Sequence, residues 1–221
     1  MNRILVTGGG TGLGRAVAAL LGDRAVILGR RADVLDQAAR ETGARAVTGD
    51  VTGAPELLLQ RTGPLDGIVH AAGHLEGGLI SGWSAGAFER LYAVHVVGPA
   101  MLTRAWAARL QGPGSVVFLG STLAVRSAPG AGAYAAAKAA QLSLSRSLAV
   151  ELADLGVRVN SLLCGVVPTP MTAGHDLADL ATLHPLGLGT PQAVASAAVA
   201  VLENPWMTGA AVPVDGGLLA T

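Results

Sequence analysis

The sequence predicts an α/β protein, with one doubly wound parallel β-sheet of about seven strands, helices on both faces and a single domain over residues 1–221. Short runs rich in valine, isoleucine and leucine recur along the chain, and such runs are typical of parallel strands buried on both faces. Stretches rich in alanine and leucine, with helical spacing, lie between them. Because 51% of the residues are hydrophobic, the chain can bury a large core.

Strands and helices are expected to alternate from the N-terminus to the C-terminus. The expected strands are 3–7, 25–28, 44–48, 65–70, 115–120, 157–163 and 210–214. The expected helices are 12–22, 32–42, 84–110, 132–155 and 190–203. The proline- and glycine-rich segment 168–189 follows the sixth strand, and we expect it to be an irregular substrate-binding loop. A plain surface loop is the alternative interpretation.

The composition argues against several classes of function. The formal net charge is zero, whereas a nucleic-acid-binding protein needs a basic face. The sequence contains no run of about 18 apolar residues, so we expect no membrane span. The N-terminus leads directly into a strand-like run, so we expect no signal peptide. Cys164 is the only cysteine, which favours a reducing, cytoplasmic location. The histidines are scattered, and we expect no metal site.

A glycine-rich loop lies between the first strand and the first helix. Gly8, Gly12 and Gly14 allow tight turns and a close approach of a phosphate to backbone N–H groups. The spacing is G-x-x-x-G-x-G, which differs from G-x-G-x-x-G. A Walker phosphate loop is excluded because Arg15 and Ala16 follow Gly14 where Lys and Ser or Thr are required. A glycine-rich turn without a ligand is the alternative.

The stretch "YAAAK" places Tyr134 four residues before Lys138, the only lysine in the chain. On a helix these two side chains lie on one face, and the ammonium favours the phenolate. Lowering the tyrosine pKa from about 10 by about three units needs about 4 kcal/mol, more than one exposed pair supplies. In a partly dry site such a tyrosine becomes a general acid or base. An incidental pair on a helix is the alternative.

Four motifs together resemble the short-chain dehydrogenase/reductase family in its classical form. They are "TGGGTGLG" (7–14), "YAAAK" (134–138), "VNSLLCG" (159–165) and "VDGG" (214–217). They occur in the family's order and spacing over nearly the whole chain. The resemblance implies a nicotinamide-dependent oxidoreductase with a seven-stranded Rossmann-type sheet.

The resemblance also implies three catalytic residues. Tyr134 would exchange a proton with the substrate oxygen while hydride moves between the cofactor and a carbonyl or secondary alcohol. Lys138 would hold the nicotinamide ribose and, together with the cationic ring, lower the tyrosine pKa. Arginine is a poor substitute for this compact ammonium. Ser121, thirteen residues before the tyrosine, would bind the reacting oxygen, with Thr122 as the less favoured choice.

A cofactor-binding set follows from the same resemblance. Beside Tyr134 and Lys138, it consists of Gly8, Thr11, Gly12, Leu13, Gly14, Asp50, Val51, Ala72, Gly73, Gly165, Val167 and Thr169.

The tip of the second strand indicates which nicotinamide is preferred. An acid there would bind the 2′-hydroxyl of NAD(H), but this strand ends with Arg30 and Arg31, which suit the 2′-phosphate of NADP(H). Asp33 is the rival residue, and we expect it to begin the next helix instead. NADP(H) is therefore favoured over NAD(H).

Some positions depart from the family pattern. His95 stands where the family has an asparagine that supports a water relay to the lysine, and His70 and Ala71 replace two asparagines after the fourth strand. Cys164 replaces a proline. His95 would either serve the relay or only fill space. If it serves, activity should fall on the acid side, near the ordinary histidine pKa of about 6.5.

The expected substrate is a small carbonyl or alcohol on an apolar skeleton. The candidate pocket walls are mostly apolar: Leu75, Leu79, Leu123, Val125 and 168–189. Four polar residues of that segment are expected to be solvated, with a polar contribution to the pocket as the alternative: His175, Asp176, Asp179 and His184.

The expected assembly is a homotetramer or homodimer. In the family, subunits associate through helices that correspond to 84–110 and 132–155, and here both are alanine-rich and sparsely charged. Two other functions stay open: reduction of an imine or enone, and a non-catalytic NADP(H)-binding redox sensor.

Overall fold

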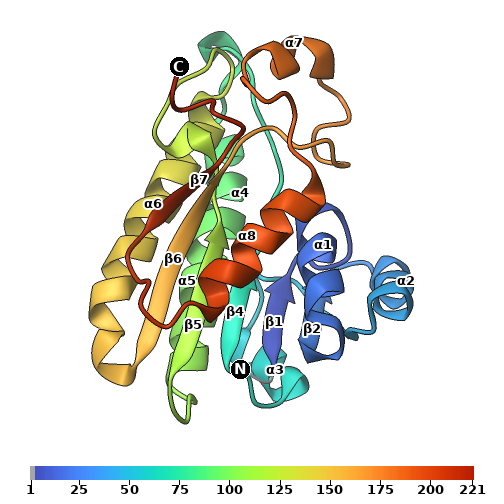
Figure 1. Ribbon diagram of the computed structural model, residues 1–221, viewed down its shortest axis with the longest axis vertical. Coiled ribbons are helices and arrows are strands. Elements are labelled where there is room, and N and C mark those ends of the chain that lie inside the picture. The colour runs from blue at the N-terminus through green and yellow to red at the C-terminus, as the bar shows by residue number, and fades with distance from the viewer. Residues whose placement is uncertain (1–2) are drawn as a thin grey trace.

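The computed structural model describes residues 3–221, so the first two residues of the expected domain lie outside the described part. The described residues form a seven-stranded sheet in the order β3-β2-β1-β4-β5-β6-β7 (Figure 1). Every neighbouring pair is parallel. The strands are β1 Ile4–Thr7, β2 Ala25–Gly29, β3 Arg45–Thr48, β4 Gly67–His70, β5 Gly114–Leu119, β6 Val157–Cys164 and β7 Ala211–Val214.

Helices connect these strands. They are α1 Gly12–Leu21, α2 Ala32–Thr42, α3 Pro55–Thr62, α4 Ala85–Tyr92, α5 Gly98–Ala107, α6 Gly132–Glu151, α7 Leu177–Thr182 and α8 Pro191–Glu203. Short 3₁₀ turns occupy Gly22–Arg24, Ile80–Gly82, Thr122–Ala124 and Ala153–Leu155. Across residues 3–221, no helix combines the length and the apolar character that a bilayer crossing requires.

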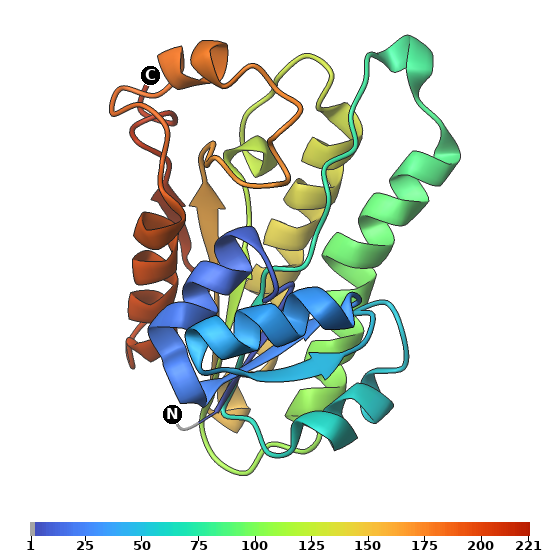
Figure 2. The ribbon, with the colours of Figure 1, turned by 90° about the vertical axis from the view of Figure 1, so that its right-hand side faces the viewer.

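Two clusters of buried hydrophobic side chains cover the two faces of the sheet. One cluster joins the sheet to α1, α2 and α8, and the other joins it to α3, α5 and α6. The two helical layers can be followed on either side of the sheet in Figure 2. The predicted doubly wound α/β fold, with about seven strands and helices on both faces, is therefore confirmed.

Three segments differ from the sequence prediction. The expected helix 84–110 is interrupted by a π-helical turn, Ala93–Val97, between α4 and α5. Helix α3 was missed, although it begins with a proline at its first turn, a favoured position. The segment 168–189 was expected to be irregular but contains α7, whose N-terminus is capped by the Asp176 carboxylate. Short helices of this kind carry too few residues for a clear helical period.

In the sheet β1 lies beside β4. From β1 the chain continues through β2 and β3 toward one edge of the sheet, and from β4 it continues through β5, β6 and β7 toward the other. A doubly wound sheet binds its ligand outside the carboxyl ends of the strands at such a point. The Thr7 hydroxyl at the end of β1 accepts hydrogen bonds from the backbone N–H groups of Ala71 and Ala72, both at 3.1 Å. These bonds fix the segment after β4 against the end of β1.

Candidate active site

A cavity of about 350 Å³ lies at the carboxyl ends of β1, β2 and β3, and we call it the first cavity. The sequence-predicted cofactor residues that line it are Gly8, Thr11, Arg30, Arg31, Asp50, Val51, Ala72 and Gly73. Residues from four separate parts of the chain thus line one cavity.

The glycine loop fits a phosphate group. Gly8 has a φ of +67°, and a Cβ atom there would lie 2.7 Å from the Cα of Ala72, so a side chain would be excluded. Within the described residues, no side chain caps the N-terminus of α1, because Thr11 makes no cap hydrogen bond. The N–H groups of this first helical turn are therefore left for an anion.

A second cavity, of about 150 Å³, shares part of its wall with the first. Its lining includes Gly12, Leu13 and Gly14 from the glycine loop. It also includes Tyr134 and Lys138 from α6, together with His95, Thr169, Pro170 and Met171. The Tyr–Lys pair and the glycine loop therefore face one continuous space.

Tyr134 is nearly fully buried, in a small apolar cluster with Leu91 of α4 and Ala137 of α6. Burial raises the pKa of its phenol, and a hydrogen bond with Ser121 acts in the opposite direction. The Lys138 ammonium lies 5.7 Å from the centre of the tyrosine ring. The chain by itself therefore does not lower the tyrosine pKa, contrary to what the lysine alone would suggest.

Ser121 follows β5 and begins the 3₁₀ turn Thr122–Ala124. Its Oγ accepts a hydrogen bond from the Leu123 N–H at 3.1 Å, and its hydroxyl is close enough to Tyr134 to oppose the rise of the phenol pKa. The serine, which the resemblance favoured over Thr122, is thus the hydroxyl next to the tyrosine.

Lys138 is buried and held by two acceptors. Its Nζ donates to the Leu119 carbonyl at 2.9 Å and to Oε1 of Gln141 at 3.0 Å. Burial lowers the pKa of the ammonium to about 8, and the neighbouring Cys164 acts in the opposite direction.

His95 lies on the π-helical turn, with its ring buried. Its Nε2 bonds to the carbonyl oxygen of His74 at 2.9 Å, while Nδ1 has no hydrogen-bond partner within residues 3–221. Burial, followed by the charge of Lys138, lowers the pKa of the ring to about 3. The acid-side fall in activity expected near pH 6.5 therefore has no basis in this ring, which stays neutral there.

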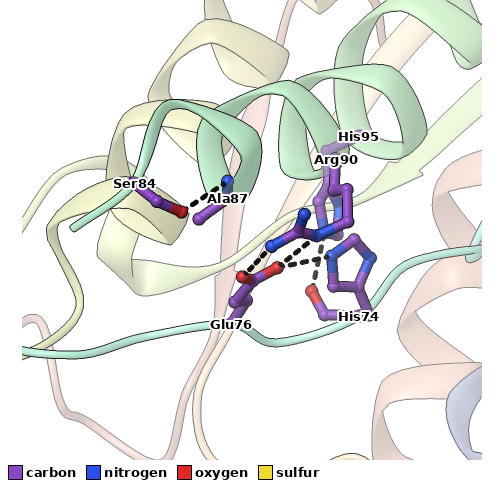
Figure 3. A network of polar contacts seen from close by, with 6 residues as sticks. All are labelled: His74, Glu76, Ser84, Ala87, Arg90 and His95. Carbon is purple, nitrogen blue, oxygen red and sulfur yellow. Dashed lines mark hydrogen bonds and ion pairs between the residues drawn. The ribbon is translucent and has the colours of Figure 1, made fainter. Parts of the chain in front are cut away.

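An ion-pair network that the sequence did not indicate lies beside this histidine (Figure 3). Arg90 of α4 binds the Glu76 carboxylate, with Nη2 2.5 Å from Oε1 and Nε 3.1 Å from Oε2. His74 lies 3.6 Å from the same carboxylate. Both Arg90 and His74 also line the first cavity. The network joins the segment after β4 to α4, which carries the π-helical turn.

The remaining predicted residues lie at the edges of the site. Gly165 and Val167 line neither cavity. Gly165 packs closely against Asp215 and His184. His184 is buried, which corrects the expectation that it is solvated: its Nε2 accepts from the Val166 N–H and its Nδ1 bonds to the Leu180 carbonyl. This histidine fastens α7 to the end of β6.

Asp33 lies in the first turn of α2, as expected, while Arg30 and Arg31 face the first cavity. Across the described residues, no cluster of three or more histidines, cysteines and carboxylates is placed to hold a metal ion.

Comparisons with known proteins agree with this arrangement. A family model described as "Enoyl-(Acyl carrier protein) reductase" matches residues 9–219. "Carbonyl reductase family member 4" of Xenopus tropicalis is 32% identical over 226 residues, covering 96% of each chain. "3-oxoacyl-[acyl-carrier-protein] reductase" of Rattus norvegicus is 33% identical over 229 residues, covering 98% of this chain and 97% of the other.

A solved structure, a "short chain dehydrogenase/reductase family protein", superposes with a TM-score of 0.90 and 34% identity, covering 99% of this chain and 97% of the other. The chain therefore belongs to the short-chain dehydrogenase/reductase family. It is an oxidoreductase that acts on carbonyl or hydroxyl groups with a nicotinamide cofactor.

Proposed function

We propose that this protein is an NADP(H)-dependent oxidoreductase that transfers hydride between nicotinamide and a carbonyl or secondary alcohol on a largely apolar small molecule. The observation that carries the proposal is the shared space of the two cavities. Tyr134 and Lys138 face it from α6, and the uncapped N-terminus of α1 faces it from the glycine loop.

Three side chains carry the protein's part of the chemistry. In reduction, Tyr134 donates its phenolic proton to the substrate oxygen. Ser121, whose Oγ accepts from the Leu123 N–H beside that phenol, donates a hydrogen bond to the reacting oxygen and orients it. Lys138 binds the nicotinamide ribose and stabilises the phenolate that remains. Bound NADP(H) supplies or accepts the hydride.

The preference for NADP(H) rests on charge at the first cavity. Arg30 and Arg31 line it at the tip of β2, and guanidinium groups bind phosphate through paired hydrogen bonds. The rival carboxylate, Asp33, belongs to the first turn of α2 instead.

The preference for an apolar substrate rests on the surroundings of Tyr134. Leu75 and Leu123 pack against its cluster, while Leu79 and Val125 are 66% and 54% exposed. We propose that 168–189 is the substrate-binding loop, since Met171 of this segment lines the second cavity. The names of the relatives, a carbonyl reductase and a 3-oxoacyl reductase, support reduction of a C=O group.

We further propose a homotetramer or homodimer in the cytoplasm. Val97, Met101 and Val150, on the helical stretches expected at the interface, are exposed apolar side chains. Light scattering of the purified protein tests the assembly, and a monomer would contradict it. Cys164, the only cysteine, is buried as a free thiol, which is compatible with a reducing compartment.

The test is turnover of a panel of ketones, 3-oxoacyl thioesters and secondary alcohols, with NADPH or NADH, followed by the absorbance of the reduced nicotinamide. We expect carbonyl reduction with NADPH. The panel also includes enoyl thioesters, because the matching family model carries an enoyl reductase description. Turnover of enoyl thioesters alone would favour that second function, and turnover of nothing, with NADPH bound, would favour a sensor.

A further inference from the structure

Gln141 is a buried polar residue that neither the motifs nor the proposed mechanism uses. It lies on α6, one turn beyond Lys138, and only 2% of its surface is exposed. Its Oε1 accepts a hydrogen bond from the Lys138 ammonium at 3.0 Å, and its Nε2 donates one to the His95 carbonyl oxygen at 2.8 Å. One side chain therefore joins the lysine to the π-helical turn between α4 and α5.

The two contacts define a single orientation of the amide. An ammonium can only donate and a carbonyl can only accept, so Oε1 must face Lys138 and Nε2 must face His95. Leucine, of similar size, would leave both buried partners short of a hydrogen bond. An ionised glutamate would satisfy the lysine and repel the carbonyl. Among the common residues that fit a buried helix position, glutamine meets both demands.

The His95 carbonyl lacks its usual helical donor because of a proline. In an α-helix a backbone carbonyl accepts a hydrogen bond from the N–H four residues on, and here that residue is Pro99, which has no N–H. Here the histidine's carbonyl, and not its imidazole, is joined to the lysine through the amide.

We propose that Gln141 is a positioning residue: its amide fastens the Lys138 ammonium to the π-helical turn and holds it, charged, toward the second cavity. The role of Lys138 in catalysis rests on the proposed function, whereas the fastening of Lys138 does not. A direct consequence is that the protonation of Lys138 depends on the group at position 141.

Three other titratable groups face Lys138. Tyr134 lies one turn before it on α6, Cys164 approaches it from β6, and His95 approaches it from the π-helical turn. Burial raises the pKa values of Tyr134 and Cys164, and burial lowers that of His95. All three are therefore neutral at neutral pH. Cys164 raises the pKa of Lys138, but it is unchanged in the variants at position 141, so a shifted midpoint reports the group at that position.

The chain offers a direct measurement, because Lys138 is its only lysine. Protein grown with lysine labelled with ¹³C at Cε gives one side-chain NMR signal, whose pH titration reports Lys138 without any substrate. Gln141→Leu should lower the titration midpoint by about one unit, since a hydrogen bond to a charged group contributes about 1.5–3 kcal/mol. Gln141→Glu should raise the midpoint by about 1–3 units through its opposite charge.

Ser145→Ala is the matched control. Ser145 is equally buried on α6, but its hydroxyl bonds to Leu142 and Ser161 and not to the lysine. Its replacement should leave the midpoint unchanged. Circular dichroism checks the fold of each variant. If Gln141→Leu does not fold, the predicted rise of the titration midpoint in Gln141→Glu still tests the proposal. A wild-type midpoint in every folded Gln141 variant would overturn the proposal.

The titration also separates this proposal from the proposed function. Shifted midpoints in a protein that reduces no carbonyl would support the role of Gln141 in positioning Lys138 and reject the carbonyl reduction proposed for the site. Unshifted midpoints in a protein that reduces carbonyls normally would reject the role of Gln141 and support the proposed function.

Discussion

The imidazole of His95 meets the phenol ring of Tyr134 edge-on, with ring centres 5.4 Å apart and planes at 89°. The histidine ring thus packs against the tyrosine, while its backbone carbonyl bonds to Gln141. This geometry favours a packing role for the His95 ring over the relay role, and the two roles differ in the pH–rate profile they predict. The ring packs beside the tyrosine and bonds to the His74 carbonyl, and the backbone carbonyl is linked to the lysine through Gln141.

Replacements of His95 should therefore leave the acid side of the pH–rate profile unchanged. Burial lowers the pKa of the ring to about 3, so it is neutral throughout the working range. His95→Asn and His95→Leu both keep the backbone carbonyl, and both should retain most of the turnover between pH 5 and pH 7. A wild-type acid limb near the ordinary histidine pKa of about 6.5, lost in His95→Asn, would restore the relay role of the ring.

Replacement of the two arginines at the tip of β2 should separate the two nicotinamides. Arg30→Ala with Arg31→Ala should weaken NADPH binding by about 2 kcal/mol or more and change NADH binding little, because a charged hydrogen bond contributes about 1.5–3 kcal/mol. Fluorescence titration with both cofactors measures this. Arg40→Ala, exposed on α2, is the control. An equal loss for NADPH and NADH would show that the arginines do not contact the 2′-phosphate.

His70 should make the protein less stable in acid. It is buried at the end of β4, bonded through Nε2 to the Thr103 hydroxyl at 2.9 Å, and burial lowers its pKa to about 3. Above about pH 6.5 the histidine is neutral in both the folded and the unfolded states. Below that pH only the unfolded state takes up the proton, so the free energy of unfolding falls by about 2 kcal/mol at pH 5.

Urea unfolding at pH 7.5 and pH 5 tests this contribution. His70→Asn should lose less stability than the wild type between these pH values, because asparagine does not titrate. His175→Asn, at an exposed position, should behave like the wild type. The same loss of stability in His70→Asn and the wild type would mean that His70 accepts its proton in the folded state.

The fold and the centre of the site could be predicted from the sequence, because local patterns indicate both. Strand-like runs, the glycine loop and the helical spacing of Tyr134 and Lys138 are short-range features, and the structure brings these residues to one space. Gln141 could be found only as a polar residue on the same helix face as Lys138. Its partner, the His95 carbonyl, lacks a helical donor because Pro99 stands four residues on, but the contact itself joins residues 46 positions apart, which no local pattern predicts.

Other contacts between distant segments could not be predicted from the sequence either. His184 looked solvated because its neighbours in the sequence are loop residues, yet it bonds to the end of β6. The Glu76–Arg90 pair joins segments 14 residues apart, and neither residue belongs to a motif.

The turnover of Tyr134→Phe, compared with the wild type on a carbonyl that the wild type reduces, tests the central claim most directly. The variant loses only the phenolic hydroxyl. We expect NADPH binding to be nearly unchanged and turnover to fall by a factor of about 100 or more, the usual contribution of a positioned acid–base group. Retention of most of the wild-type turnover, with NADPH bound normally, would contradict the assignment of Tyr134 as the general acid and base.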